Sequence, residues 1–331
     1  MKTNRIFKTS IITNLILTIF CTVGLTVSAV AAEATVKITP LGSHDGEFCA
    51  ADRALIFEDP DGTRILYDAG RTVRGGTDTR LGKIDGVLLS HVHGDHLGDI
   101  HQATANAGSC SAPDFSIKSI PSSVMEEVIL SKKAKLFVGG EMASFFSRRI
   151  KEAGGSTDLV QLVRFGGQSK IGGVKIASVP AAHSNGLDSK FLAVPLSDTL
   201  SSNGLTAYVG AAGGYVLTFS NGLVVYLSGD TGIIADQEAV VRQFYKAKLA
   251  VLNIGGTFST GPQEAAYVIN DLVKPNAVIA SHANEAATKD GKLIEGSKAM
   301  EFKTAVKVPT YVPLSGKTME FDKEAKCVAG C

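Results

Sequence analysis

Short apolar stretches alternate with polar turns along most of this chain, beginning near residue 35. Runs in which apolar residues alternate with polar ones, or stand together in a short block, predict strands. The predicted strands of the first two thirds are Thr35–Leu41, Ala54–Glu58, Arg64–Asp68, Val87–Ser90, Leu136–Val138, Leu159–Phe165, Val174–Pro180, Tyr215–Phe219 and Leu223–Ser228. Two connections carry sequences typical of hairpin turns, Asp59-Pro60-Asp61-Gly62 and Asn221-Gly222.

A second pattern, with apolar residues three or four positions apart, predicts helices. The segments with this spacing are Ser122–Ser131, Met142–Ala153, Asp236–Tyr245 and Pro262–Leu272. Strands predicted at Leu249–Asn253 and Ala277–Ser281 alternate with the last two helices. Because two strand-rich halves are each completed by helices, we expect an α/β fold of four layers, an αββα sandwich. No linker interrupts residues 32–331, so we expect one domain there.

The first residues have a different pattern, which predicts a signal peptide over residues 1–31. Lys2, Arg5 and Lys8 form a basic start, Ile11–Val30 is almost uncharged, and Ala29-Val30-Ala31 has small residues at a cleavage spacing. An uncleaved N-terminal anchor is the alternative, since the apolar run approaches membrane-spanning length. We expect cleavage, a periplasmic or secreted location, and no stable membrane association afterwards.

Removing this segment takes away three basic residues and no acidic one, so the formal net charge changes from +1 to −2. A slightly acidic protein lacks the basic patch of nucleic-acid binders, and we expect no nucleic-acid partner. A small-molecule substrate is expected instead, and the sequence leaves the oligomeric state open.

Four cysteines follow the predicted signal peptide, and an even count in an exported protein suggests disulfides. Cys327 and Cys331 would close a short C-terminal loop, and Cys49 would then pair with Cys110 by elimination. Four cysteines allow three connectivities, and free structural thiols are a further alternative.

Candidate chemistry is concentrated in one hexapeptide, His91-Val92-His93-Gly94-Asp95-His96, directly after the apolar run 86–90. Imidazole nitrogens with one carboxylate suit zinc, with iron, manganese or nickel as alternatives. A solvated polar loop is the other interpretation, but the chain has only seven histidines in all. The hexapeptide therefore predicts half of a metal site.

Three further residues end apolar strands in the same way: His183, Asp230 and His282. Strand ends converge along one edge of a sheet, so residues that are distant in sequence can meet in one cleft. These three residues are therefore the candidates for the missing half of the site.

This set of residues resembles the metallo-β-lactamase superfamily over most of the chain after the predicted signal peptide. The hexapeptide matches the superfamily's His-x-His-x-Asp-His, and His183, Asp230 and His282 follow in the order of its later ligands. The second half is similar to the UlaG-like group, which is related to ascorbate-phosphate lactonases. The segments that carry this similarity are His183–Gly186, Ser228–Gly232, Ile254–Phe258 and Gly261–Ala266.

Two positions depart from the pattern of that group. Ala283 stands where an aromatic residue often follows the last histidine, and Leu41–His44 only loosely matches the group's Gly-His. The resemblance therefore does not transfer a substrate.

The resemblance implies two divalent cations, Zn²⁺ first among them, with Mn²⁺, Fe²⁺ or Ni²⁺ as alternatives. His91, His93 and His183 would hold one cation, Asp95, His96 and His282 the other, and Asp230 would bridge them. A hydroxide held between the two cations would attack an ester, lactone or amide carbonyl, with Asp95 and Asp230 as catalytic residues.

The same centre could serve other reactions, and these alternatives stay open. Removal of halide from an activated aromatic ring and phosphodiester cleavage are alternatives within the hydrolase class. A diiron redox protein and a non-catalytic metal-binding module are alternatives outside it, although diiron relatives commonly carry Glu where this chain has His93.

Four residues are candidates for contacts with the ligands or the substrate: His44, Asp68, Ser184 and Asn253. Asp68 ends a predicted strand and could brace a ligand histidine, with a turn cap as the alternative. The polar segment 184–214 is long enough for a lid or pocket wall. We expect His101 on a helix after the hexapeptide, at the surface or behind a ligand, and Asp52 and Arg53 as a surface or structural pair.

Overall fold

The computed structural model describes residues 1–3 and 34–331. Most of the predicted signal peptide lies outside the described residues, so its cleavage stays a prediction. Residues 34–331 form one compact unit. Among the described residues, no helix has the length and apolar character needed to span a bilayer.

Two large sheets form the centre of this unit. The first has eight strands in the order β10 (Val160–Leu162), β9 (Lys135–Val138), β4 (Gly86–Leu88), β3 (Arg64–Tyr67), β2 (Leu55–Glu58), β1 (Val36–Pro40), β22 (Met319–Phe321) and β23 (Cys327–Ala329). The second has seven strands in the order β11 (Gln168–Ile171), β12 (Val174–Pro180), β15 (Gly213–Thr218), β16 (Val224–Leu227), β17 (Leu249–Asn253), β18 (Ala277–Ser281) and β21 (Thr310–Tyr311).

Helices and smaller strand pairs occupy the connections. The longer helical segments are α2 (Val124–Lys132), α3 (Met142–Glu152), α4 (Leu196–Ser202), η4 (Gln237–Tyr245), α5 (Pro262–Tyr267), η5 (Val268–Val273) and α6 (Lys298–Ala305). The shorter ones are α1 (Gly94–Leu97), η1 (Thr79–Leu81), η2 (Thr157–Leu159) and η3 (Ser189–Phe191). The small two-stranded sheets are β5 (Ile100–His101) with β8 (Ile117–Lys118), β6 (Gly108–Ser109) with β7 (Ala112–Pro113), β13 (Gly186–Leu187) with β14 (Ala207–Tyr208), and β19 (Thr288–Lys289) with β20 (Lys292–Leu293).

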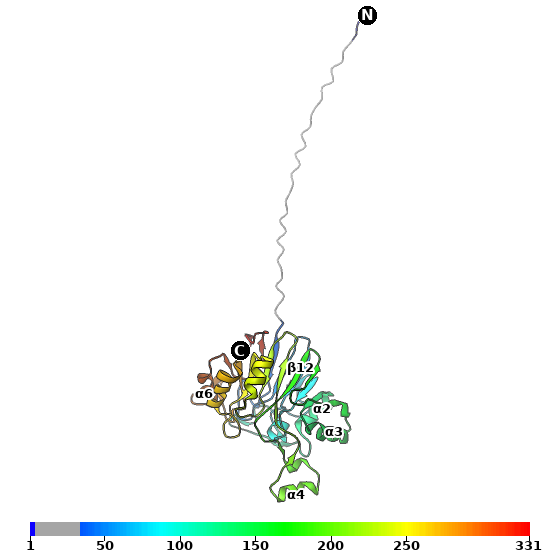
Figure 1. Ribbon diagram of the computed structural model, residues 1–331, viewed down its shortest axis with the longest axis vertical. Coiled ribbons are helices and arrows are strands. Elements are labelled where there is room, and N and C mark those ends of the chain that lie inside the picture. The colour runs from blue at the N-terminus through cyan, green and yellow to red at the C-terminus, as the bar shows by residue number, and fades with distance from the viewer. Residues whose placement is uncertain (4–33) are drawn as a thin grey trace. The chain divides into compact units, whose positions relative to one another are not determined.

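Three buried apolar clusters establish the order of the layers. The middle cluster joins the facing sides of the two sheets, for example Phe57 and Leu88 with Leu217 and Val251. A second cluster packs α2 and α3 on the outer face of the first sheet. A third packs η4, α5, η5 and α6 on the outer face of the second sheet. The expected αββα sandwich is confirmed, with α2 and α3 on one flank and α6 on the other in Figure 1.

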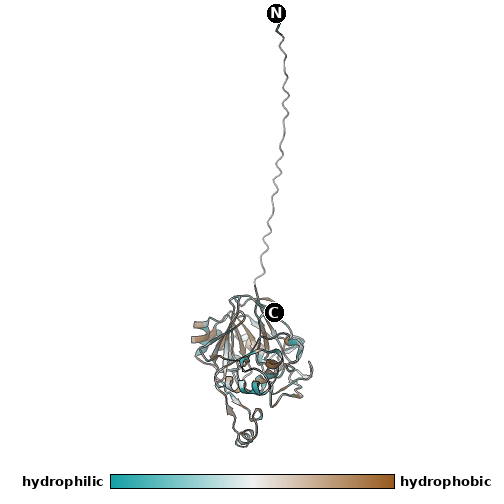
Figure 2. Cartoon of the chain, turned by 90° about the vertical axis from the view of Figure 1, so that its right-hand side faces the viewer, coloured by the Kyte–Doolittle hydropathy of each residue, from teal (hydrophilic) through white to brown (hydrophobic). Residues whose placement is uncertain are grey.

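Local sequence explains where several of these elements begin and end. Figure 2 shows the apolar residues gathered on the strands, as burial on both faces of a sheet requires. Helix α2 begins at the N-cap residue Ser123, whose Oγ accepts from Glu126 N–H (3.3 Å) and donates to the Glu126 carboxylate (2.8 Å). The helix ends at Lys133, which adopts the left-handed conformation typical of a C-terminal cap.

Predicted and observed elements agree closely where strands are long and apolar, and the bounds of β12, β17 and β18 are the predicted ones. Helix α6 and strands β11, β22 and β23 were not predicted, because they are short and weakly patterned. The prediction that His101 lies on a helix is wrong, and so is its surface alternative. Helix α1 ends at Leu97, and His101 lies in β5 with 8% exposure.

The polar segment 184–214 has structure of its own and projects from the sandwich. It contains β13, η3, α4 and β14, and α4 forms the outermost part in Figure 1. Leu187, Phe191 and Val209 are buried in the cluster beneath α2 and α3 and anchor its base. The tip is exposed, with Val194 at 71% and Leu205 at 58%.

Candidate metal centre

The seven predicted ligands follow strands whose C-terminal ends meet at one edge of the sandwich. In the second sheet, β16, β17 and β18 are mutually parallel, and β12 runs in the same direction through the antiparallel β15 between them. His183, Asp230 and His282 come just after β12, β16 and β18. In the first sheet, β4 is parallel to β3 and leads into the hexapeptide that ends in α1.

His91, His93 and His183 form the first group of ligand-type atoms. Nδ1 of His93 lies 3.0 Å from Nε2 of His91 and 3.3 Å from Nε2 of His183. Nδ1 of His91 and Nε2 of His93 face the hydroxyls of Ser90 (2.9 Å) and Ser184 (3.5 Å). Three ring nitrogens therefore converge on one point, and this group could hold one cation.

Asp95, His96 and His282 form the second group. Oδ2 of Asp95 lies 3.4 Å from Nε2 of His282 and 3.8 Å from Nε2 of His96. Both histidines are buried, whereas the Asp95 side chain is 31% exposed. This group could hold a second cation, with Asp95 on the side that faces solvent.

Asp230 lies between the two groups. Its Oδ2 is 3.8 Å from Nε2 of His183 in the first group and 3.3 Å from Nε2 of His282 in the second. Its Oδ1 is 3.5 Å from Nε2 of His96. The Asp230 carboxylate therefore reaches ring nitrogens of both groups, which is the geometry of a bridging ligand.

Orphaned nitrogens indicate that these residues fit metal ions. Among the described residues, Nε2 of His96 and both ring nitrogens of His282 are buried without a hydrogen-bond partner. Leaving buried polar atoms unpaired costs about 1–3 kcal/mol each. A divalent cation accepts such nitrogen lone pairs, and zinc takes His and Asp ligands of this kind. The donor set therefore fits zinc or a similar divalent ion.

Charge within the centre favours the ionised carboxylates. Burial alone would raise the pKa of Asp95, but the Arg53 guanidinium and the imidazoles of His96 and His282 outweigh it and hold that pKa well below its usual range. Burial acts likewise on Asp230, where His96 and His282 keep the pKa low. Both carboxylates are therefore available as ligands at neutral pH.

The histidines differ in protonation. Burial, aided by neighbouring imidazoles, lowers the pKa of His91, His93 and His183, and burial with the Arg53 charge lowers that of His282. For His96 the carboxylates of Asp230, Asp68 and Asp95 outweigh burial and raise the pKa to about 10. Without a bound cation, His96 therefore favours its protonated form. A cation that binds this imidazole must displace the proton.

Two of the predicted supporting residues lie against ligands. Nδ1–H of His96 donates to Oδ2 of Asp68 (2.8 Å), which directs Nε2 of His96 into the centre. Ser184 contacts His93 as described above. The sequence left a turn cap as the alternative for Asp68; the structure places its carboxylate against His96, a candidate ligand.

The other two candidates lie elsewhere. Asn253 sits behind the loop that carries Asp230, where it accepts from Thr231 N–H (3.3 Å) and donates to Thr260 Oγ1 (2.8 Å). His44 contacts Ser43 Oγ (3.1 Å) and the Gly108 carbonyl (3.4 Å), and it does not line the pocket over the ligands. Asn253 therefore supports the Asp230 loop from behind, and His44 is not brought to the centre.

Sequence reasoning missed two supporting residues. Asn185 Oδ1 accepts from the backbone N–H of Val92 (2.7 Å) and locks the hexapeptide to the projecting segment. The expected surface or structural pair of Asp52 and Arg53 is not formed: both residues are buried, and Arg53 pairs with Asp95. The only sign of this role in the sequence was a basic residue directly before a predicted apolar strand.

A cavity of about 490 Å³ opens over the centre. Its floor is formed by candidate ligands, namely His93, Asp95, His183, Asp230 and His282. One wall comes from the projecting segment through Ser184, Gly186, Asp188 and Thr206. Phe258, 71% exposed, and Asn284 stand on other sides. The projecting segment is thus a pocket wall.

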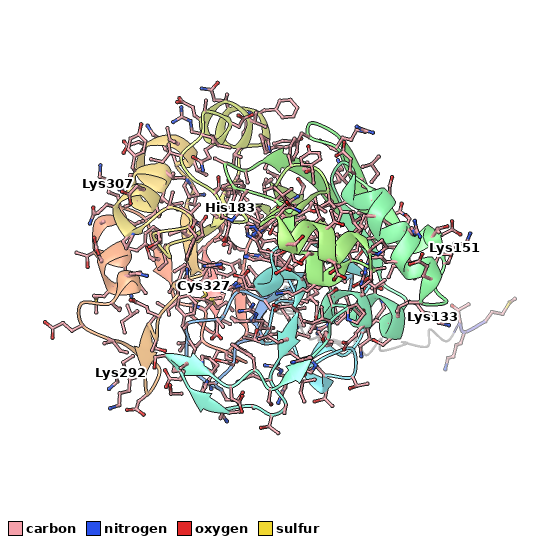
Figure 3. All side chains as sticks on the ribbon, turned by 90° about the horizontal axis from the view of Figure 1, so that it is seen from below. Lys133, Lys151, His183, Lys292, Lys307 and Cys327 are labelled. Carbon is pink, nitrogen blue, oxygen red and sulfur yellow. A yellow bond between two sulfur atoms is a disulfide. The ribbon has the colours of Figure 1, made fainter. Side chains whose placement is uncertain are left out.

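No lysine or arginine among the described residues lines this cavity. Arg53 and Lys190 instead pair with two of its lining carboxylates, Asp95 and Asp188. In Figure 3, which looks at the molecule from below, His183 lies near the middle of the view, whereas Lys133, Lys151, Lys292 and Lys307 lie toward its periphery. The charged groups that line the cavity are therefore carboxylates, together with whatever cations the centre holds.

The two expected disulfides, Cys49–Cys110 and Cys327–Cys331, are both formed. The first joins the loop before β2 to the turn between β6 and β7, next to the loop that carries Arg53. None of the four sulfurs belongs to the groups of candidate ligands.

Comparison with known proteins gives one consistent family. Residues 63–283 match the family described as the Beta-lactamase superfamily domain. A UPF0173 metal-dependent hydrolase from Cupriavidus necator is 28% identical over 79% of this chain and 81% of its own length. One from Pelotomaculum thermopropionicum is 31% identical over 72% of this chain and 83% of its own length.

Solved structures support the same fold. Igni18, a metallo hydrolase from Ignicoccus hospitalis, has a TM-score of 0.57 at 21% identity, covering 87% of this chain and 99% of its own. The expected resemblance is thus confirmed by sequence and by fold. The chain has the metallo-β-lactamase fold. It belongs to the family described as the Beta-lactamase superfamily domain and is a metal-dependent hydrolase.

Proposed function

We propose that this chain is an exported hydrolase that uses two divalent cations, zinc first among them, to cleave an ester, lactone or amide bond in a small molecule. One observation carries the proposal: Asp230 lies within 3.8 Å of ring nitrogens from both ligand groups. A carboxylate in that position is what a two-cation centre requires and a single closed site does not.

When bound, a pair of cations would supply a water nucleophile of lowered pKa and polarise the carbonyl under attack. The side chains do the positioning. Asp68 and Ser90 orient His96 and His91 by hydrogen bonds to the ring nitrogens that face away from the centre. Because its pKa is held low, the Asp95 carboxylate stays an acceptor and orients the attacking water rather than carrying its proton.

The cavity supports a small neutral or weakly charged substrate. A volume of about 490 Å³ suits a small molecule, and Phe258 offers an apolar face at its edge. Recognition of phosphate commonly uses Arg or Lys, and none lines the cavity among the described residues. Carbonyl compounds are therefore favoured over phosphodiesters.

Metal content and one substitution test the proposal. We expect two zinc ions per chain by elemental analysis, and loss of hydrolysis of a lactone, ester and amide panel on chelation. Asp230→Ala should lose the second equivalent and all turnover, while the exposed Asp114→Ala control keeps both. Full turnover by Asp230→Ala would show that the two-cation mechanism is wrong.

The same measurements separate the alternatives. Two iron ions with an optical band would indicate a diiron redox protein. Turnover of halogenated aromatics or phosphodiesters, with none of carbonyl compounds, would assign the centre to those reactions. Two tightly held ions without turnover of any of these compounds would indicate a non-catalytic module.

Export is the part of the proposal that rests on sequence alone. Expression of the full chain in a Gram-negative host should give a periplasmic protein whose N-terminus, by mass spectrometry, begins at or next to Ala32. An intact chain retained in the membrane fraction would favour the uncleaved anchor instead.

A further inference from the structure

Arg53 is a buried cation at the edge of the candidate metal centre. Its side chain is 5% exposed, and its Nη1 donates to the Asp95 carboxylate and to the Asp95 backbone oxygen (3.3 Å). A charge that leaves water requires a partner of opposite charge. The neighbourhood of Arg53 therefore shows which carboxylate fills that role.

Asp52 is adjacent to Arg53 in sequence but makes its hydrogen bonds to other groups. Its two oxygens accept from the backbone N–H groups of Ser43 (2.8 Å) and Cys49 (2.9 Å). Among residues 34–331, Asp95 is the carboxylate within ion-pair distance of Arg53. Asp95 thus serves both as counter-ion of Arg53 and as a candidate ligand.

Both roles fall on the same oxygen. Oδ2 of Asp95 receives the guanidinium and also faces Nε2 of His282 (3.4 Å) and Nε2 of His96 (3.8 Å). A cation held by Asp95, His96 and His282 would therefore lie only a few ångström from a fixed positive charge. Like charges this close repel strongly in a partly buried site.

The other group has different neighbours. Among the described residues, the charged groups with the largest influence on His91, His93 and His183 are other imidazoles and the carboxylates of Asp95 and Asp230. For His282 the Arg53 charge is the second largest influence after burial. The positive charge of Arg53 therefore acts most strongly on the second group, through its contact with Asp95.

We propose that Arg53 makes the two cation positions unequal: the Asp95–His96–His282 group binds its cation more weakly than the His91–His93–His183 group, because Arg53 offsets the Asp95 charge. This inference rests on the proposed two-cation function. If turnover requires both cations, as proposed, occupancy of the second position and the rate of turnover would follow the free metal concentration.

A purely structural role for Arg53 makes the opposite prediction. If Arg53 only held Asp95 in place, every substitution would weaken the second position. If its charge is what matters, Arg53→Gln should bind the second equivalent more tightly, and Arg53→Lys should stay close to the unsubstituted chain. The direction of the change therefore separates charge from positioning.

The test is a zinc titration of the chelator-stripped chain against a competing chelator of known affinity, with bound zinc counted by elemental analysis. We expect two equivalents whose dissociation constants differ by roughly tenfold or more. Arg53→Gln should tighten the weaker one by roughly tenfold or more. Arg149→Gln, which removes a part-buried arginine paired with Glu126, is the matched control and should change neither.

Folding is checked separately by circular dichroism, and Arg53→Met replaces Arg53→Gln if the latter does not fold. Two equivalents of equal affinity in the unsubstituted chain, or a second equivalent no tighter in the neutral variant, would overturn the inference while leaving two-cation binding intact. A single equivalent in every folded variant would instead overturn the proposed two-cation function.

Discussion

Asp68 stands just after β3 with a left-handed backbone (φ 42°) and accepts three hydrogen bonds. They come from Ser90 N–H (2.8 Å), Ser90 Oγ–H (2.7 Å) and Nδ1–H of His96 (2.8 Å). This one side chain therefore ties the end of β3 to the loop that carries the hexapeptide. A non-glycine residue at positive φ costs stability and marks a place where the surroundings impose the conformation.

Removing that carboxylate should weaken cation binding. Without its acceptor, the His96 ring loses its fixed orientation, and we expect Asp68→Ala to lower metal affinity by roughly 10–100-fold. Competition with a chelator measures this directly, and Asp114→Ala serves as the exposed control. Unchanged affinity in Asp68→Ala would show that His96 is oriented by other contacts.

Asp78 gives a prediction on acid stability. Its side chain is fully buried and accepts from Arg74 N–H (2.9 Å) and from the Arg80 backbone and guanidinium. Burial opposes ionisation, but these hydrogen bonds and the Arg80 charge outweigh it and lower the pKa to about 2 from 3.8. A lowered carboxyl pKa stabilises the fold above pH 3.8, and this contribution is lost as pH falls toward 2.

We therefore expect Asp78→Asn to lower the free energy of unfolding by about 2 kcal/mol at pH 7, and by progressively less between pH 4 and 2. Urea unfolding at several pH values measures the difference, with Asp114→Asn as control. A deficit that stays constant down to pH 2 would assign the effect to lost packing instead of charge.

At the scale of elements, the ends of strands carry the chemistry. Positions such as His183, Asp230 and His282 could be predicted because each follows a clear apolar strand in a known motif. The Arg53–Asp95 pair could not be predicted, since it joins residues 42 positions apart and depends on how loop and helix pack. The role of Asn185 could not be predicted for the same reason, because its partner Val92 lies 93 positions away.

The projecting segment divides into an anchored base and an exposed tip, which predicts separate roles. Replacing residues 193–205 with a short Gly-Ser linker should leave metal content unchanged and Tm within about 2 °C, since α4 buries none of its residues. KM should change, because Thr206 and Asp188 beside the tip line the cavity. Kinetics with the best substrate of the panel, alongside calorimetry, measure both. A large fall in Tm would mean that the tip supports the fold.

At the scale of the whole molecule, the centre joins the two sheets. Four candidate ligands follow β4 of the first sheet, and three follow strands of the second. Cations held there would link the two sheets. The four-layer order could be predicted from the strand and helix pattern, whereas the pairing of β1 with β22 could not, because strand partners distant in sequence leave no local signal.

Chelation should therefore lower global stability. A ligand present at 1,000 times its dissociation constant adds about 4 kcal/mol to the free energy of unfolding. We expect Tm to fall by roughly 6 °C or more when zinc is removed, and to recover on adding zinc back. Scanning calorimetry measures the shift, with Asp230→Ala as the control that should respond less. An unchanged Tm would mean that the cations contribute little to holding the sheets together.

The pairing of β1 with β22 has a consequence for chain connectivity. Val36 lies opposite Phe321, so the first and last parts of the compact unit are neighbours on one sheet. A flexible linker could join residue 331 to residue 34, and new termini could be opened at the exposed tip near Asn203. Such a circular permutant would keep every strand neighbour and every candidate ligand in place, which makes the tip the natural site for inserting a reporter domain into a working enzyme.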